Sequence, residues 1–401
     1  MSEHHGNLLP MVEYEKSDND HTYLKRYRDE AAVAISPFGF PIALRYSGIA
    51  LLTNPETTRQ LETEAVRKQG ITSGPIFEAY NRSMLFSNGA VHKNRRGPVA
   101  RTFSFKLMEG MRTEIAELAT EIVTSVKGAG AFNFLDAFAG DIPARIIARI
   151  LGVPEENMPR FRKLTYSVTR SLRMGFDRAE QADIERDSEL LVGEVDRLIE
   201  DRRAFPRDDF ISKLLADAEQ RFELSDEELL WQVITLIVAG SDTTRLALCS
   251  TLALLLQHPE QWETFCADPD GLKANVVREG VRYEPPIGSF ARIATVDVDL
   301  DGATLPAGSP VSVCLLSAMR DESVYRDPAV FDIARGDHPR WHPAFGIGEH
   351  RCLGEALARA ELEECLAVIA RLAPGIRLTK VPKVRGLNGI RRIDQMWVEM
   401  A

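Results

Sequence analysis

A short segment near the C-terminus combines one cysteine with closely spaced glycines. Residues 345–354 read FGIGEHRCLG, and an apolar helix pattern follows directly. Glycine allows a tight turn and a close approach of the backbone to a flat surface. Because Cys352 stands just before a helix, backbone amides and the helix dipole favour its thiolate form. A thiolate held in this way suits a heme iron. The alternative is an inert buried cysteine, which is what we expect of Cys249, Cys266, Cys314 and Cys365.

This segment resembles the heme-ligand loop of the cytochrome P450 family, whose pattern is F-x-x-G-x-(R/H)-x-C-x-G. The resemblance implies that the cofactor is heme b, that Cys352 is the axial ligand of its iron, and that His350 contacts a propionate. It extends in the family's order from about Ile42 to the C-terminus. The matching positions are Phe345, Gly348, His350, Cys352 and Gly354.

A polar cluster interrupts the middle of a long apolar helix pattern. Residues 239–244 read AGSDTT and resemble the family's oxygen-binding motif, (A/G)-G-x-(D/E)-T. Splitting dioxygen in a water-poor pocket requires delivered protons, which a hydroxyl and a nearby carboxylate can supply. The resemblance therefore implies that Gly240 leaves room for oxygen and that Thr243 and Asp242 are the alcohol and the acid. The alternative is an ordinary polar cluster in a kinked helix.

An acid and a base lie three residues apart in a later helix pattern. Glu279 and Arg282 share one face of that helix, a spacing that in isolation is typical of a solvated pair. In the family, E-x-x-R pairs with an arginine ahead of the cysteine loop and locks the proximal core. Arg335 occupies that position here. A buried triad of this kind is stable only when complete, because removing one member leaves a charge unpaired.

Four side chains are candidates for binding the heme propionates by the same resemblance. They are His92, Arg96, Arg292 and His350. Two carboxylates need several cationic or hydrogen-bonding partners. His92 and Arg96 would share a helical face, but Pro98 follows closely and proline inside a helix is expected to kink it. Taken singly, each of these residues is typical of a surface charge.

Segments that face the substrate in the family are mainly apolar in this chain. This character predicts a small hydrophobic or aromatic substrate. Tyr80 or Arg82 is a candidate to hold a carboxylate or hydroxyl, and a solvated Arg82 is the alternative. The expected substrate-facing residues are Ile76, Phe77, Tyr80, Ile234, Val238, Ala239, Ile287, Ser289, Phe290, Leu387 and Ile390.

The resemblance implies a heme-thiolate monooxygenase that activates O2 and hydroxylates or demethylates its substrate. The two electrons must come from outside, because the chain has no flavin or dinucleotide fingerprint and no iron–sulfur cysteine cluster. We expect a ferredoxin with an NAD(P)H-dependent reductase as the donor. A basic patch for an acidic ferredoxin is expected at Lys93, Arg95, Arg101, Arg351 and Arg359.

Other functions stay open at this point. A peroxide-dependent peroxygenase, or a heme-thiolate isomerase or dehydratase, would not need protons delivered in this manner, so Asp242 and Thr243 favour O2 activation. A heme-based sensor is disfavoured because the sequence contains nothing resembling a signalling or DNA-binding domain.

Composition narrows the class of protein. The 401 residues include 49 Lys and Arg against 59 Asp and Glu, a net charge of −10. This balance disfavours nucleic acid and anionic membrane surfaces as partners. Five widely spaced cysteines build no disulfide framework, and the first residues lack the basic and apolar regions of a signal peptide. We expect a cytoplasmic protein, a monomer, with no membrane partner.

Hydrophobic periodicity predicts a mainly α protein with small β-sheets, and the resemblance implies that this is the cytochrome P450 fold. We expect one domain over residues 1–401, with residues 1–30 as a surface arm, a long central helix and a minor β region. Segment 295–313 reads as strands with a turn at Asp301-Gly302. The expected elements are a hairpin at 42–54, a helix at 55–67, a long loop at 71–89, and helices at 111–126, 179–199, 226–257 and 353–372.

Overall fold

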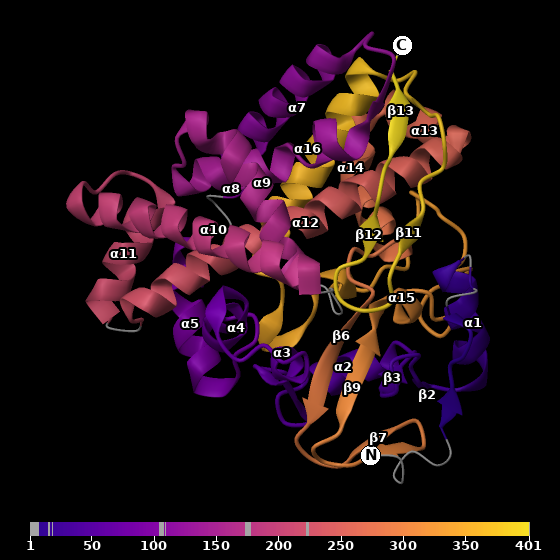
Figure 1. Ribbon diagram of the computed structural model, residues 1–401. Coiled ribbons are helices and arrows are strands. Elements are labelled where there is room, and N and C mark those ends of the chain that lie inside the picture. Colours follow the sequence, from indigo (N-terminus) through magenta and orange to yellow (C-terminus); the bar gives the residue numbers. More distant parts are fainter. Residues whose placement is uncertain are drawn as a thin grey trace. The chain divides into compact units, whose positions relative to one another are not determined.

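The computed structural model describes residues 8–14, 17, 19–103, 108, 110–172, 178–221 and 224–400. It is mainly helical with small β-sheets, as the sequence predicts (Figure 1). The chain forms two compact units. We call Met1–Leu61, Asn275–Cys352 and Lys383–Ile393 the sheet unit, and Glu62–Ala274, Leu353–Pro382 and Asp394–Ala401 the helical unit. The expectation of a single domain stays a prediction.

A six-stranded mixed sheet organises the sheet unit. Strand β6 carries Arg292, one of the residues expected to bind the heme. This residue pairs with Val311 of β9 on one side and with Gln60 of β4 on the other. The hydrophobic core on this sheet includes Val33, Leu52 and Val313. In spatial order the strands are β1 (Leu9–Pro10), β2 (Val33–Ile35), β3 (Pro41–Ala43), β9 (Pro310–Cys314), β6 (Ser289–Ala294) and β4 (Thr58–Gln60).

Two small hairpins and short helices complete the sheet unit. The expected turn at Asp301-Gly302 is confirmed, since both residues have positive φ and join β7 (Val298–Leu300) to β8 (Ala303–Leu305). A second antiparallel pair joins β11 (Val384–Arg385) to β12 (Arg392–Ile393). The helices are α1 (Asp20–Glu30), α2 (Ser47–Thr53) and α15 (Leu315–Ala318).

The prediction for residues 1–30 was wrong in part. Helix α1 spans the second half of this segment and buries Tyr23, Leu24 and Tyr27 against the sheet unit. Asn19 caps it by accepting hydrogen bonds from the amides of His21 and Thr22. The segment from 20 onward is therefore part of the core and not a surface arm.

The hairpin expected at 42–54 is also wrong. Only β3 is extended, and residues 47–53 form α2 with Gly48, Ile49 and Leu52 buried. Ile49 and Leu52 lie one and four residues after Gly48, so the three buried residues share one face of a helix. In a strand, buried residues would alternate with exposed ones.

The helix expected at 55–67 is replaced by two short elements. Strand β4 pairs with β6, and the Thr58 hydroxyl donates 2.7 Å to the carbonyl of Leu52. The ladder and this buried hydrogen bond outweigh local helix propensity. Helix α3 (Glu64–Lys68) follows. The loop expected at 71–89 is wrong in part, because Gly74–Arg82 forms α4.

The helical unit is built around α12 (Asp226–Gln257). Ser225 and Glu228 form the capping box that the sequence predicts. Helix α12 contacts α8 (Ile142–Leu151), α9 (Met158–Thr169) and α16 (Glu355–Leu372). It is long and apolar enough to cross a membrane by length and composition, yet 78% of its apolar window is buried within the structure. It therefore behaves as a core helix here.

The other predicted helices of this unit are confirmed within a few residues. Segment 111–126 is α7 (Arg112–Val126), 179–199 lies within α10 (Arg178–Ala204), and 353–372 is α16. The remaining elements are α5 (Gly89–Thr102), α11 (Phe210–Arg221), α13 (Pro259–Ala267), the start of α14 (Pro269–Tyr283), and the sheet of β10 (Arg377–Leu378), β13 (Trp397–Glu399) and β5 (Ala131–Asn133).

Candidate functional site

The cysteine loop is held by its own backbone. The amide of Cys352 donates 2.7 Å to the carbonyl of Phe345, and the amide of Arg351 donates 3.1 Å to the carbonyl of Gly348. Gly346 and Gly348 have φ of 71° and 73°, a left-handed conformation that favours glycine. A Cβ at position 348 would also lie 3.3 Å from the carbonyl oxygen of Thr53. The two glycines are therefore required by the fold of the loop.

Cys352 differs from the other four cysteines in exposure. Its side chain is exposed, three residues before α16 begins, whereas Cys249, Cys314 and Cys365 are buried and Cys266 is partly buried. Burial raises the pKa of those four thiols, to about 11 for Cys266 and about 12 for Cys314. Cysteine is normally among the most buried residue types. An exposed cysteine at the tip of a rigid loop is available as a soft metal ligand.

Arg292 is buried on β6 without a carboxylate partner. It is only 2% exposed, and its Nε donates 3.0 Å to the hydroxyl of Thr58. No carboxylate of the described residues forms an ion pair with it. Burial lowers the pKa of Arg292 to about 10, and the negative charge of Glu349 opposes this lowering. A buried guanidinium of this kind fits an anionic group supplied by a cofactor.

The two candidate histidines lie in different units. In the sheet unit, Nε2 of His350 lies 3.7 Å from Oε1 of Glu349. In the helical unit, His92 is buried on α5, with Nδ1 2.9 Å from the carbonyl of Met84.

Pro98 does not end α5, because the helix continues through Pro98 to Thr102. The following turn is held by a hydrogen bond from the Thr102 hydroxyl to the Pro98 carbonyl. Arg96 is partly buried one turn beyond His92, so the two residues share a helical face.

The oxygen-binding motif forms a less buried strip on α12. Ala239 and Thr243 are partly buried and Gly240 is exposed, in a helix whose neighbouring residues are otherwise buried. A Cβ at position 240 would meet no atom within 4 Å. The Thr243 hydroxyl donates 3.0 Å to the carbonyl of Ala239. This face of α12 therefore has space beside a hydroxyl that can exchange its hydrogen-bond partner.

Asp242 is held on the buried side of α12. Its carboxylate pairs with the guanidinium of Arg245, which lies 4.0 Å from the ring centroid of Tyr166. The Tyr166 hydroxyl donates 2.9 Å to the carbonyl of Gly140. The sequence reasoning missed Arg245 and Tyr166, although the three-residue spacing of Asp242 and Arg245 was a usable signal.

A second acid near the motif was also missed. Glu361 on α16 is buried, and burial raises its pKa to about 8, while a hydrogen bond from Thr244 opposes this rise. The carboxyl is therefore protonated at neutral pH. No signal in the sequence of α16 distinguishes Glu361 from its neighbours Glu363 and Glu364.

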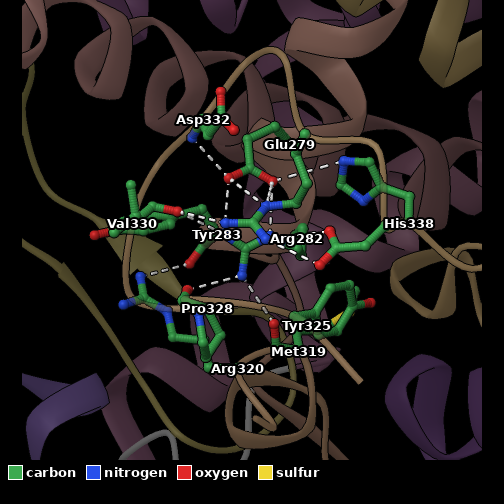
Figure 2. A network of polar contacts seen from close by, with 12 residues as sticks. Glu279, Arg282, Tyr283, Met319, Arg320, Tyr325, Pro328, Val330, Asp332 and His338 are labelled. Atoms are coloured by element: carbon green, nitrogen blue, oxygen red, sulfur yellow. Dashed lines mark hydrogen bonds and ion pairs between the residues drawn. The ribbon is translucent and has the colours of Figure 1, made fainter. Parts of the chain in front are cut away.

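Glu279, Arg282 and Arg335 are in contact in the sheet unit. Nε of Arg282 lies 2.7 Å from Glu279, and Nε of Arg335 lies 3.2 Å from the same carboxylate. Arg282 also donates to the carbonyls of Met319, Pro328 and Val330, as Figure 2 shows.

A histidine that the sequence reasoning missed adjoins this cluster. Nε2 of His338 lies 3.6 Å from Glu279. Burial and the neighbouring arginines lower the pKa of His338 to about 4, so it is neutral at physiological pH. The cluster therefore sets Glu279 between two guanidinium groups, and Asp337 is a second carboxylate partner of Arg335 at 3.2 Å.

The expected substrate-facing residues of the helical unit are mostly packed. Ile76, Phe77 and Tyr80 lie in a cluster on α4, and the Tyr80 ring stacks on Phe86 at 4.0 Å. Arg82 pairs with Glu78 and Glu227, which favours its solvated role. On α12, Ile234 and Val238 are buried and Ala239 belongs to the strip beside Gly240.

The expected substrate-facing residues of the sheet unit converge around the start of β6. Ile287 forms a β-bridge with Ile390, and the Ser289 hydroxyl lies 2.9 Å from the side-chain oxygen of Asn388. Leu387 is 2% exposed and packs in the core with Leu24 and Leu44, so it is chiefly a core residue. Phe290 is partly buried against the sheet core.

The chemistry of these groups fits heme. The sheet unit offers an exposed sulfur at Cys352 for the iron, and the guanidinium of Arg292 for a propionate. Phe345, Gly348 and Gly354 shape the loop on either side of the sulfur; a Cβ at position 354 would meet no atom within 4 Å.

The family model described as "Cytochrome P450" matches residues 60–264 and 272–371. A plant-inducible cytochrome P450-pinF1 of Rhizobium radiobacter is 38% identical over 382 residues, covering 95% of this chain and 90% of that protein. A biotin biosynthesis cytochrome P450 of Bacillus subtilis is 32% identical and covers 79% of each chain.

The solved structures that resemble this chain include cytochromes P450 as well. P450BioI, in a complex with acyl carrier protein ligated to hexadec-9Z-enoic acid, has a TM-score of 0.86 and 28% identity, covering 96% of this chain and 99% of that one. A myxobacterial cytochrome P450 in complex with myristic acid has a TM-score of 0.83 and 31% identity, covering 96% and 98%. The chain therefore belongs to the cytochrome P450 family: it has the P450 fold, its cofactor is heme b, and it is a monooxygenase.

Proposed function

We propose that Cys352 is the axial ligand of the heme iron, and that Arg292, His350, His92 and Arg96 bind the propionates. The observation that carries this proposal is the exposed sulfur of Cys352 on a rigid loop, in the same unit as a buried arginine without a carboxylate partner among the described residues. The buried cluster of Glu279, Arg282 and Arg335 would keep the proximal core rigid.

When bound, the heme supplies oxygen activation: one atom of O2 enters the substrate and the other leaves as water, with two electrons and two protons consumed. The chain's part is to deliver the protons. The Thr243 hydroxyl donates to a backbone carbonyl and can turn to donate elsewhere. The Asp242 carboxylate would bring protons from the solvent once it leaves the guanidinium of Arg245.

The proposed reaction is hydroxylation or demethylation of a small hydrophobic or aromatic molecule. Support comes from the apolar side chains of α4, α12 and β6 described above. The solved relatives named with a fatty acid or a fatty-acyl carrier agree with an apolar substrate.

The proposed electron donor is a ferredoxin with an NAD(P)H-dependent reductase. Several members of the expected basic patch are paired locally: Arg95 with Glu228, Arg101 with Asp217, and Arg359 with Glu355. Their positive charge is thereby reduced at the surface. We place the enzyme in the cytoplasm as a monomer without a nucleic-acid or membrane partner, in line with its charge of −10.

Absorbance of the reduced, carbon-monoxide-bound protein tests the heme ligand. Thiolate ligation gives a main band at long wavelength, which the wild type is expected to show and Cys352→Ala to lose. Cys266→Ala, a partly buried cysteine away from the loop, is the matched control and should keep the band. A colourless wild-type protein after expression with ample heme would withdraw the proposal.

Thr243→Ala tests the proton-delivery role and separates O2 activation from the peroxygenase and isomerase or dehydratase alternatives. We expect product formed per NAD(P)H consumed to fall by about tenfold or more, with hydrogen peroxide released instead. Thr243→Ser keeps a hydroxyl and should largely restore coupling. Fully coupled turnover in the alanine variant, or turnover that depends strictly on added peroxide, would refute the role.

A further inference from the structure

A buried glutamine lies in the first half of α12. Gln232 is 0% exposed, and the residues on either side of it, Trp231 and Val233, are also buried. It belongs to none of the motifs described above. Burying a side-chain amide costs free energy unless its oxygen and its hydrogens find partners. The role of Gln232 is therefore to be sought in the groups that its hydrogen bonds hold.

The Gln232 amide joins α12 to the turn that connects α4 with α5. Its Nε2 donates 2.6 Å to the carbonyl of Glu228, one turn earlier in α12, and 2.9 Å to the carbonyl of Arg82, the last residue of α4. Its Oε1 accepts a 2.7 Å hydrogen bond from the amide of Met84. Backbone groups at the end of a helix need partners from outside it. An amide supplies both the donor and the acceptor that this turn needs, and an apolar side chain supplies neither.

The same turn holds the ring of His92. Nδ1 of this buried histidine lies 2.9 Å from the carbonyl of Met84. Because a carbonyl only accepts hydrogen bonds, Nδ1 is the nitrogen that carries the proton in this contact. The bond commits Nδ1 to Met84, so His92 can meet an anion only through Nε2. Two consecutive hydrogen bonds, one at the amide and one at the carbonyl of Met84, thus connect Gln232 to the imidazole.

We propose that Gln232 is a positioning residue that holds His92 in the orientation for binding a heme propionate. By fixing Met84, it keeps the imidazole in one orientation and one tautomer before the heme arrives, so less conformational entropy is lost on binding. Gln232 acts through His92 and does not itself contact the heme in this proposal. All three residues belong to the helical unit. The inference rests on the proposed function, in which His92 binds a propionate.

Heme release in a double-mutant cycle tests the inference. Heme transfer from the holoenzyme to excess apomyoglobin is measured for Gln232→Met, for His92→Leu and for the double variant. We expect Gln232→Met to speed heme dissociation by about fivefold or more, but by less than about twofold when His92→Leu is already present. Independent effects that multiply in the double variant would overturn the inference, because Gln232 would then act on the fold and not through His92.

The reduction potential of the heme gives a second readout, which a loss of stability alone does not shift. A propionate that loses a hydrogen-bond donor keeps more negative charge near the iron, and this favours the ferric state. Gln232→Met should therefore lower the potential in the same direction as His92→Leu. Gln257→Met is the matched control, because this exposed glutamine of α12 donates only to Ala253 of its own helix. It should change neither the potential nor heme release.

A second variant at the same position keeps the test available if Gln232→Met does not fold. Gln232→Glu retains the chain length and an oxygen that accepts from the Met84 amide. It should give values between those of the wild type and Gln232→Met, and the same cycle with His92→Leu applies to it. If His92→Leu alone leaves heme release and the potential unchanged, the proposed role of His92 fails and the inference fails with it. If His92→Leu changes both values and the Gln232 variants change neither, only the inference is overturned.

Discussion

Buried arginines of the sheet unit differ in the groups that balance their charge. Arg282 and Arg391 each have carboxylate partners: the buried Glu279 for the first, and the partly buried Glu284 with the buried Asp20 for the second. Arg292 has only the hydroxyl and carbonyl of Thr58 among the described residues. A buried charge without a counter-ion destabilises a fold unless something else supplies the opposite charge. Arg320 also lacks an ion pair with a carboxylate of the described residues, but its guanidinium carbon lies 3.7 Å from the ring centroid of Tyr283 and Nη2 donates 3.0 Å to the carbonyl of that residue. Arg292 has no aromatic ring of this kind among the described residues, so at the scale of single residues it is the buried arginine that best suits an anionic ligand.

The first prediction concerns Arg292→Met. We expect the apoprotein to unfold at an equal or higher denaturant concentration, because a desolvated charge is replaced by an apolar side chain of similar length. Heme should instead dissociate faster, by about tenfold or more, equivalent to about 1.4 kcal/mol. The measurement is heme transfer to excess apomyoglobin. Arg377→Met, at a 71% exposed arginine paired with Glu399, is the control. Unchanged heme dissociation would remove Arg292 from the propionate set.

The second prediction concerns Glu279→Gln. Its carboxylate faces Arg282 and Arg335 with no exposure to solvent, so the variant leaves Arg282 without its counter-ion and Arg335 with only the partly exposed Asp337. We expect the free energy of unfolding to fall by about 3–5 kcal/mol. Chemical denaturation measures it. Asp29→Asn removes a carboxylate from an ion pair with Lys25 whose members are about half exposed, and should change stability by less than about 1 kcal/mol. Similar effects of the two variants would contradict the account.

The site residues that could be predicted belong to motifs whose members lie close together in the sequence. Glu279 and Arg282 are one turn apart on a helix, and Cys352 lies in a segment whose pattern is contained within ten residues. Tyr166 and His338 approach the motifs only through tertiary packing. The sequence around them carries no periodic or spacing signal for that contact.

At the scale of elements, length decides what periodicity can predict. Helix α12 has many turns of apolar pattern and a capping box, and it was predicted correctly. Elements α2 and β4 have seven and three residues, so local propensity is weak there. Their state is set by the ladder to β6 and by the buried hydroxyl of Thr58.

Packing of α16 against α12 has an electrostatic consequence. It buries Glu361 beside Thr244 and raises the pKa of the carboxyl from 4.5 to about 8. The folded protein therefore keeps a proton that the unfolded chain releases above about pH 4.5. Since the unfolded state then binds fewer protons, this group makes the protein less stable as the pH rises through that window.

The third prediction is the pH dependence of Glu361→Gln. Between about pH 5 and pH 8, the free energy of unfolding of the wild type should fall relative to the variant by about 1.4 kcal/mol per pH unit. The difference should level off above pH 8, where both states are ionised. Denaturation of the holoenzyme at several pH values measures it, with Glu117→Gln at an exposed position of α7 as the control. A constant difference over this range would contradict a buried neutral acid.

At the scale of the whole molecule, charge opposes the proposed partner. The chain carries a net charge of −10, and an acidic ferredoxin would be repelled at long range. Attraction has to come from groups at the contact itself, such as the guanidinium groups of Arg340 and Arg351 beside Trp341. Salt weakens the long-range repulsion first, because charges farther apart than the Debye length of about 10 Å at 0.1 M are largely screened. The ion pairs at the contact lie well within this distance, so their attraction is screened less.

The fourth prediction follows from this competition between distant repulsion and local attraction. The second-order rate of heme reduction by ferredoxin should first rise with added salt, as repulsion is screened, and then fall, as the contact pairs weaken. Stopped-flow reduction under carbon monoxide measures it. In an Arg340→Gln, Arg351→Gln double variant the falling limb should be reduced, since the local attraction is gone while the net charge becomes more negative. A rate that only rises with salt in the wild type would mean that no basic contact exists, and electron delivery would then have to depend on apolar surface alone.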